Sequence, residues 1–163
     1  SLFLGGAGDD TPLAVLDRIG TGLRAMRERH ASMAMVVVRF EPGRLRIASA
    51  GMPPLLVHRA ASGLIEEVLV PGVPLGTLSE ARYDDRTVPL ARHDTVLVMS
   101  DGLVEAIGPD GEPFGYVRVA ELLGSLAGRP ASAVVDGLLE GVSEHLGGAP
   151  PTDDITVVAA VCS

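Results

Sequence analysis

The sequence predicts an α+β domain with a mostly antiparallel sheet, and three observations lead to this class. Short β-rich runs cluster in the first two thirds of the chain, whereas two helical patterns lie together late in it, an order unlike repeated βαβ units. The length of 163 residues suits one domain. The chain is 47% hydrophobic with 2 Tyr, 3 Phe and no Trp, so aliphatic side chains must form the core.

The first periodic segment predicts an amphipathic helix that runs to about Arg29. Asp10 or Thr11 is the candidate N-cap, and Pro12 suits the first helical turn. Gly20 and glycine at 22 weaken the helix, so its stability must come from packing. The apolar residues at helical spacing are Leu13, Leu16, Ile19, Leu23 and Met26.

Two hairpins are expected next. The runs "MAMVVVRF" (33–40) and "RLRIASA" (44–50) flank the turn "EPG", with Leu45 and Ile47 on one face of the second strand. The segment "PPLLVHRAASGLIEEVLV" (53–70) holds two further short strands around a turn at 60–63. "PGVPLG" then interrupts regular structure with two prolines and two glycines.

The last third predicts a mixture of strands and helices. A polar, exposed strand is expected at 82–89 and a buried strand at 95–100. Helices are expected at 116–126 and at 131–146, the second ended by a glycine pair. "DDITVVAAVCS" (153–163) predicts another buried strand with acids at its head.

Composition excludes several classes of function. The formal charge is −8 with a pI of about 4.9, and the basic residues are all arginine, so general binding to a phosphate backbone is excluded. Arg24, Arg27 and Arg29 are interpreted as an exposed helix face rather than a phosphate site. The single cysteine, Cys162, cannot form an internal disulfide, and no apolar run approaches the length of a membrane span. A cytoplasmic domain without membrane contact is therefore predicted.

Acids stand at the ends of two predicted strands. Asp101 follows the run "DTVLVMS", while Asp153 and Asp154 precede "ITVVAAV". If these strands are antiparallel neighbours, the three carboxylates meet at one rim of the sheet. Mutual repulsion then favours a cation, and oxygen ligands with flanking glycines indicate Mg²⁺ or Mn²⁺ rather than zinc.

A purely structural interpretation of these acids remains open at this point. Asp-Gly after a strand is a common turn, and Asp153 is equally suited to capping the turn after "GGAPPT". The two motifs together favour a metal site more than either does alone.

Five ordered blocks carry a resemblance to a known family. "LRIASAGMPPLLVHR", "VPGVPLG", "DTVLVMSDGLVEA", "GEPFGYVRVAELL" and "TDDITVVAAV" resemble the sporulation stage II protein E-like serine phosphatases, the bacterial branch of the metal-dependent protein phosphatases (PPM type). The resemblance covers the chain from end to end. It implies an αββα sandwich of two mostly antiparallel sheets flanked by helices, here incomplete at its N-terminus.

The resemblance also implies site residues and chemistry. Asp101 and Asp153 fall on positions that bind a pair of Mn²⁺ or Mg²⁺ ions, Gly102 lies beside the site, and Asp154 matches a recurrent acid. The implied reaction is direct hydrolysis of phosphoserine or phosphothreonine by water, without a covalent intermediate. The implied substrates are phosphorylated anti-anti-sigma regulators, with upstream sensor domains controlling activity.

The sequence departs from the family pattern in two places. Met52 stands where the family often has His, at a position that is not an essential ligand. The glycine-rich block "G-D-x-x-G-H-G", which supplies the bridging Asp, is not found, and the resemblance implies that it lies just before Ser1. Independently, "SLFLGG" reads like the tail of a helix, which predicts that the chain is a fragment of a longer protein. The chain is thus expected to be one phosphatase domain, residues 1–163, without its N-terminal strands and inactive by itself. The rival hypothesis is a non-catalytic, phosphatase-like regulatory or partner-binding module.

Overall fold

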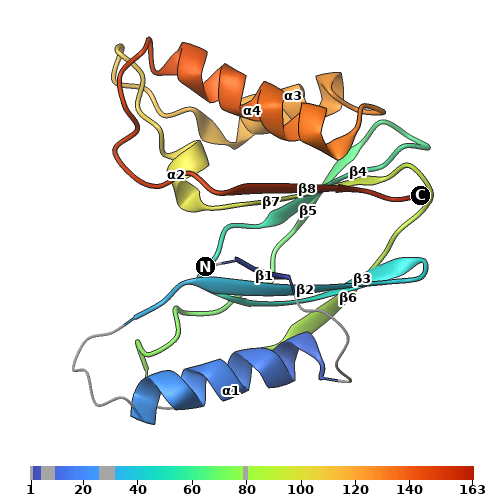
Figure 1. Ribbon diagram of the computed structural model, residues 1–163, viewed down its shortest axis with the longest axis vertical. Helices are drawn as coiled ribbons and strands as arrows, with labels where there is room; N and C mark the ends of the chain where they lie inside the picture. Colours follow the sequence, from blue (N-terminus) through green and yellow to red (C-terminus); the bar gives the residue numbers. More distant parts are fainter. Residues whose placement is uncertain (1, 5–9, 26–31, 79–80) are drawn as a thin grey trace. The chain divides into compact units, whose positions relative to one another are not determined.

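The computed structural model describes residues 2–4, 10–25, 32–78 and 81–163. These residues form eight strands and four helices, so the predicted α+β class with two mostly antiparallel sheets is confirmed. Figure 1 shows the elements along the chain. Their bounds are β1 Leu2–Leu4, α1 Pro12–Ala25, β2 Met35–Glu41, β3 Arg44–Ala50, β4 Leu55–His58, β5 Ile65–Val68, β6 Asp85–Pro89, β7 Thr95–Met99, α2 Asp101–Val104, α3 Gly115–Ser125, α4 Ala131–His145 and β8 Val157–Val161.

The chain divides into two compact units, each with its own sheet. The first unit comprises residues 1–52 and 69–90, and the second comprises residues 53–68 and 91–163. The chain therefore leaves the first unit after β3, builds the β4–β5 hairpin in the second, and returns to add β6 beside β3.

The first unit is a four-stranded sheet covered on one face by α1 (Figure 1). Its strand order is β1-β2-β3-β6, with β1 parallel to β2 and the other pairs antiparallel. The Thr11 hydroxyl accepts a hydrogen bond of 3.1 Å from the Ala14 amide, which confirms the predicted cap of α1. Leu16 is fully buried against the sheet, and Gly20 lets α1 approach Leu75 closely.

The beginning of the chain corrects one prediction. Leu2–Leu4 form a strand, not the tail of a helix, and pair in parallel with Val36–Val38. A short apolar run has no periodicity that separates helix from strand, so the partner strand decides its conformation. The predicted end of α1 near Arg29 and the arginines at 27 and 29 lie outside the described residues, while Arg24 is exposed as expected.

The second unit is an antiparallel sheet in the order β5-β4-β7-β8, with α2, α3 and α4 on one face. Leu56, Leu97 and Met99 project from the sheet into this core. They pack against apolar side chains of the helices, which are Leu103, Val119, Leu123, Val134, Leu138 and Val142. The predicted late helices are confirmed to within a residue at each end.

β8 corrects the prediction of a second buried strand. It lies at the edge of its sheet, is shorter than the predicted 153–163, and its five residues are each half-buried. By contrast, all five residues of β7 are buried, because β7 has a strand on either side. A continuous apolar run alone does not distinguish an edge strand from a central one.

A buried acid ties the β4–β5 turn to the start of β7. Asp94 is 1% exposed, and its carboxylate accepts hydrogen bonds from the Ala60 and Ala91 amides at 3.0 Å and from Arg59 at 2.8 Å. Arg59 also binds Glu66 across the hairpin. Burial acts to raise the pKa of Asp94, but the two amides and Arg59 outweigh it, so the pKa of Asp94 is lowered.

None of the helices in the described residues could cross a lipid bilayer, since they are too short or too polar.

Candidate functional site

The predicted site residues lie at one end of the β7–β8 pair. Asp101 is the first residue of α2, directly after β7, and Gly102 is buried behind it. Asp153 and Asp154 are exposed and precede β8. β7 and β8 are antiparallel neighbours, with Met99 opposite Val157, so the strand pairing on which the sequence prediction depends is present and brings the two acid-bearing segments to the same end of the pair.

The hydroxyl of Ser100 joins the two segments beyond the last strand pair. It accepts a hydrogen bond from the Thr156 amide at 2.9 Å and donates one to the Asp154 carbonyl at 3.1 Å. The Ser100 amide donates to the Thr156 carbonyl at 2.9 Å. Three hydrogen bonds therefore tie Ser100, which precedes Asp101, to Asp154 and Thr156.

Gly102 makes this close approach possible. A Cβ atom at this position would lie 2.5 Å from the Asp154 carbonyl oxygen and 3.1 Å from its carbon. Real Cβ atoms do not approach a backbone oxygen this closely, so any larger residue would push the two segments apart. The glycine in "SDG" is thus required by packing against the "DD" segment.

The carboxylates themselves are open to solvent. Asp101 accepts a hydrogen bond of 3.1 Å from the Gly102 amide, and Asp153 accepts one of 2.7 Å from the Asp154 amide. Within the described part of the chain, no arginine lies within ion-pair distance of these acids. Their charges are therefore available to a ligand from solution.

The donor chemistry fits a hard divalent cation, but the number of donors is small. The side chains offer only carboxylate oxygens, which Mg²⁺ and Mn²⁺ accept. Among residues 2–4, 10–25, 32–78 and 81–163, no three acids, histidines or cysteines come close enough together to hold an ion. These residues fit one part of a ligand set, held in place by Ser100 and Gly102.

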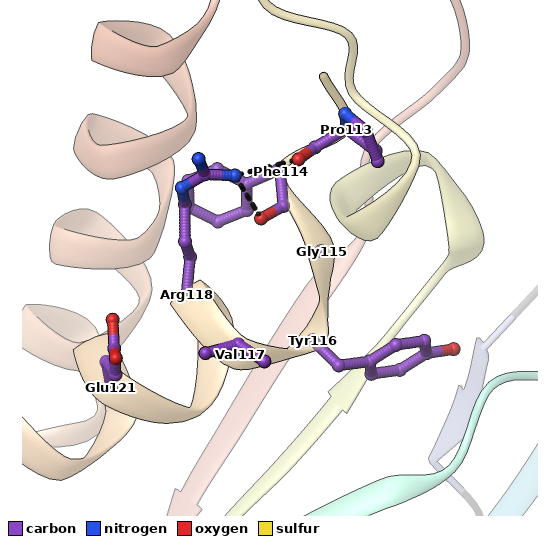
Figure 2. Close-up of a pocket in the computed structure, with 7 residues that line it drawn as sticks. All are labelled: Pro113, Phe114, Gly115, Tyr116, Val117, Arg118 and Glu121. Atoms are coloured by element: carbon purple, nitrogen blue, oxygen red, sulfur yellow. Dashed lines mark hydrogen bonds between the residues drawn. The ribbon is translucent and has the colours of Figure 1, made fainter.

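An aromatic side chain stands at the start of the helix that packs against α2. α2 packs against α3, and Tyr116 stands in the first turn of α3. Burial raises the pKa of Tyr116, and the charges of Glu67, Glu105 and Asp101 raise it further. In Figure 2 the Tyr116 ring points away from Arg118 and Glu121.

Two of these residues were not singled out from the sequence. The sequence pattern places Ser100 only at the end of a strand. A serine before an Asp-Gly helix start is a recognisable N-cap signal, but the Ser100 hydroxyl makes no cap hydrogen bond to α2 and bonds to the other segment instead. Tyr116 lies 15 positions after Asp101, and no local pattern connects the two. Met52, by contrast, is only partly buried and belongs to the first unit.

Comparison with known proteins places this geometry in context. The model of the family described as "Stage II sporulation protein E (SpoIIE)" matches residues 6–162. No curated protein matches the sequence.

Solved structures share the fold at low sequence identity. The SiaA-PP2C domain of Pseudomonas aeruginosa superposes with a TM-score of 0.82 at 24% identity, over 96% of this chain and 63% of that one. The RsbU and RsbW domains of Rv1364c from Mycobacterium tuberculosis have a TM-score of 0.79 and 23% sequence identity, and the match covers 95% of this chain and 44% of that one. The phosphatase domain of SpoIIE from Bacillus subtilis (Mn presoaked) has a TM-score of 0.65 and 21% sequence identity, and the match covers 96% of this chain and 67% of that one. The chain thus spans less than two thirds of the first two structures.

Proposed function

Because the chain belongs to the stage II sporulation protein E family, we propose that it is part of a metal-dependent phosphoserine/phosphothreonine protein phosphatase. One observation carries the proposal: β7, β8, Ser100 and Gly102 hold the backbone of Asp101 against that of Asp154. This tight backbone contact places exposed acids of both segments at the same edge of the sheet, where they add nothing to core packing and can bind a cation.

The proposed cofactors are two Mn²⁺ or Mg²⁺ ions. Asp101 and Asp153 are the proposed ligands, with Asp154 as a further candidate and Gly102 as a neighbour. Such ions supply Lewis-acid stabilisation of phosphoryl oxygens and lower the pKa of water. By the family resemblance, the remaining ligands come from a "G-D-x-x-G-H-G" block upstream of Ser1.

The residues of this chain have positioning and electrostatic roles in the proposed reaction. Asp101 and Asp153 act as ligands rather than as proton-transfer groups. Ser100 fixes the separation of the two segments, since its hydroxyl contacts the backbone of the second segment at two points. Gly102 has no side chain, and this allows the two segments to lie in close backbone contact.

The proposed substrate is a bacterial signalling phosphoprotein, such as an anti-anti-sigma regulator in the cytoplasm. The names of the structural relatives support this choice, because they describe an RsbU–RsbW protein and a cell fate determinant. Upstream sensor domains are the proposed source of control.

The alternative is a non-catalytic phosphatase-like module that binds a partner. It is favoured by the absence, within the described residues, of a group of three metal-ligating side chains. The exposed Asp101 and Asp153 weigh against it, since a binding module needs neither acid at the edge of the sheet.

Phosphate release from a phosphoserine peptide with Mn²⁺ tests the proposal. The chain extended upstream through the glycine-rich block is expected to turn over the peptide, and Asp101→Asn or Asp153→Asn to reduce the rate by orders of magnitude, because carboxamides ligate divalent cations poorly. Asp136→Asn, at an exposed position on α4, is the matched control and should keep the parent rate.

Circular dichroism of each variant checks that the fold is retained. Near-parental turnover by either site variant would refute the ligand assignment. An extended chain that binds Mn²⁺ but releases no phosphate would favour the partner-binding alternative.

A further inference from the structure

The negative charge of the chain is concentrated in the second unit. This unit holds 13 of the 21 Asp and Glu residues but only 4 of the 13 arginines, a formal charge of −9. The first unit, with 8 acids and 9 arginines, carries +1. A ligand attracted to the second unit is therefore positively charged where it meets the protein surface.

An apolar groove opens on this acidic unit at the start of α3. It has a volume of about 610 Å³ and is shallow, so it suits a side chain of a docked segment rather than an enclosed small molecule. Val117 is 71% exposed and Tyr116 is 38% exposed. The groove is lined by Pro113, Phe114, Gly115, Tyr116, Val117, Arg118 and Glu121 (Figure 2).

The one cation in the groove wall is already engaged. Arg118 turns back and donates hydrogen bonds to the Pro113 carbonyl at 2.8 Å and to the Phe114 carbonyl at 3.0 Å (Figure 2). Both bonds come from Nη1, and they hold the guanidinium against the entry to α3. Glu121 is the other charged residue that lines the groove.

The groove lies beside the segment that carries Glu105. The Phe114 amide in its wall donates a hydrogen bond of 2.8 Å to the Ala106 carbonyl, and the Glu105 amide donates one of 2.9 Å to the Asp101 carbonyl. In accord with this arrangement, burial raises the pKa of Tyr116 and the charges of Glu67, Glu105 and Asp101 raise it further. Glu67 and Glu105 are exposed and are not among the proposed metal ligands, so their charges remain when cations occupy the site. The apolar groove thus adjoins the segment in which Glu105 follows Asp101 by one helical turn.

We propose that this groove docks the protein segment that carries the phosphoserine, with an apolar side chain against Val117 and Tyr116 and an arginine or lysine facing Glu67 and Glu105. The phosphoserine part of this inference rests on the proposed function. The preference for a basic, apolar segment rests only on the groove and its charges.

Binding of labelled peptides, followed by fluorescence anisotropy, tests the docking without any need for turnover. The probes are short peptides that carry a non-hydrolysable phosphonate analogue of phosphoserine and a leucine, flanked by arginines, by serines or by glutamates. The arginine-flanked probe is expected to bind most tightly and to lose affinity with added salt, since screening weakens exposed charge pairs.

Variants locate the binding surface. Val117→Asn is expected to weaken the arginine-flanked probe by about tenfold through loss of the apolar contact without a change of charge. Glu105→Gln is expected to weaken it by about threefold and to reduce its salt dependence. Leu139→Asn and Glu140→Gln make matched changes at exposed positions on α4 and should leave the affinity unchanged.

The outcomes separate this proposal from the proposed function. Selective binding that is lost in Val117→Asn supports the groove even if phosphate release fails, in which case the phosphatase assignment alone falls. Equal binding of the three probes, or equal loss in the α4 controls, overturns the docking proposal. So does sedimentation that shows a dimer broken by Val117→Asn with peptide affinity unaltered, because the groove would then bind a second copy.

Discussion

The hydroxyl of Ser100 lies between the Thr156 amide and the Asp154 carbonyl and hydrogen-bonds to both. Asp154 is 54 residues away along the chain, so this single side chain links two distant segments. Removing it would leave one amide and one carbonyl without their partner.

Ser100→Ala is expected to lower the free energy of unfolding by about 1 kcal/mol, since Ser100 is only partly buried and water replaces some of the lost bonding. Ser100→Thr keeps the hydroxyl and should recover most of the loss. Urea unfolding measures both variants, together with Mn²⁺ affinity of the extended chain. Unchanged stability and unchanged Mn²⁺ affinity in Ser100→Ala would show that the link is dispensable.

Gly102→Ala is expected to be more damaging than its size suggests. The added Cβ would lie 2.5 Å from the Asp154 carbonyl oxygen, so backbone must move, at about 1 to 3 kcal/mol. Gly22→Ala is the matched control, because nothing lies within 4 Å of its Cβ and alanine favours an exposed helix by up to about 1 kcal/mol. Equal melting temperatures for the two variants would contradict the packing argument.

Divalent cations are expected to stabilise the extended chain. Mn²⁺ that binds only the folded state raises the melting temperature in proportion to its affinity, and it relieves repulsion among Asp101, Asp153 and Asp154. Asp101→Asn should lose most of the shift. A flat melting temperature across a Mn²⁺ titration would favour the interpretation of these acids as turn residues.

The chain of residues 1–163 by itself is expected to bind at most one divalent ion, weakly, and to release phosphate negligibly. The reason is that two ions require a bridging carboxylate, which the family resemblance assigns to the upstream block. Calorimetry with Mn²⁺ compares the short and extended chains. Tight binding of two ions by the short chain, with the turnover of the extended one, would show that the missing ligand has been misplaced.

Asp94 makes the stability of the second unit depend on pH. Its pKa is lowered in the folded state, so its contribution is complete above the unfolded pKa of about 4 and is lost as the pH falls through the lower, folded value. Asp94→Asn should lower stability at neutral pH by about 3 kcal/mol, because Arg59 loses a buried partner.

The same substitution should flatten the acid side of the stability profile. Thermal unfolding between pH 3 and about 7 measures both effects. Asp85→Asn, at a less buried ion pair with Arg46, is the control and should change stability far less. A parallel pH profile in Asp94→Asn and the parent would refute the role of Asp94.

Local patterns predicted most of the elements, because hairpin turns and helix caps involve residues a few positions apart. The "EPG" turn, the Thr11 cap and the late helices are examples. Strand partners could not be predicted in the same way. β6 returns to β3 after the β4–β5 hairpin, and Leu2–Leu4 became a strand only through β2.

The meeting of the two acid segments could be predicted because it depends on one antiparallel pairing. The Arg59–Asp94 pair, 35 residues apart, could not, since a buried acid before a strand looks like any turn residue. The effect of the Asp101 charge on the pKa of Tyr116 depends on how α2 packs against α3, which no local pattern encodes.

The pairing of β7 with β8 also sets the order of events during synthesis. Ribosomes add about 5 to 20 residues per second, so the 54 residues from Ser100 to Asp154 take roughly 3 to 10 s to make. Throughout that interval β7 exposes an unpaired edge to other nascent chains and to chaperones. All five of its residues are buried in the folded structure. The candidate site therefore cannot assemble before Asp154 and β8 have been synthesised, and mutations that delay the pairing of β8 are expected to reduce the yield of folded protein.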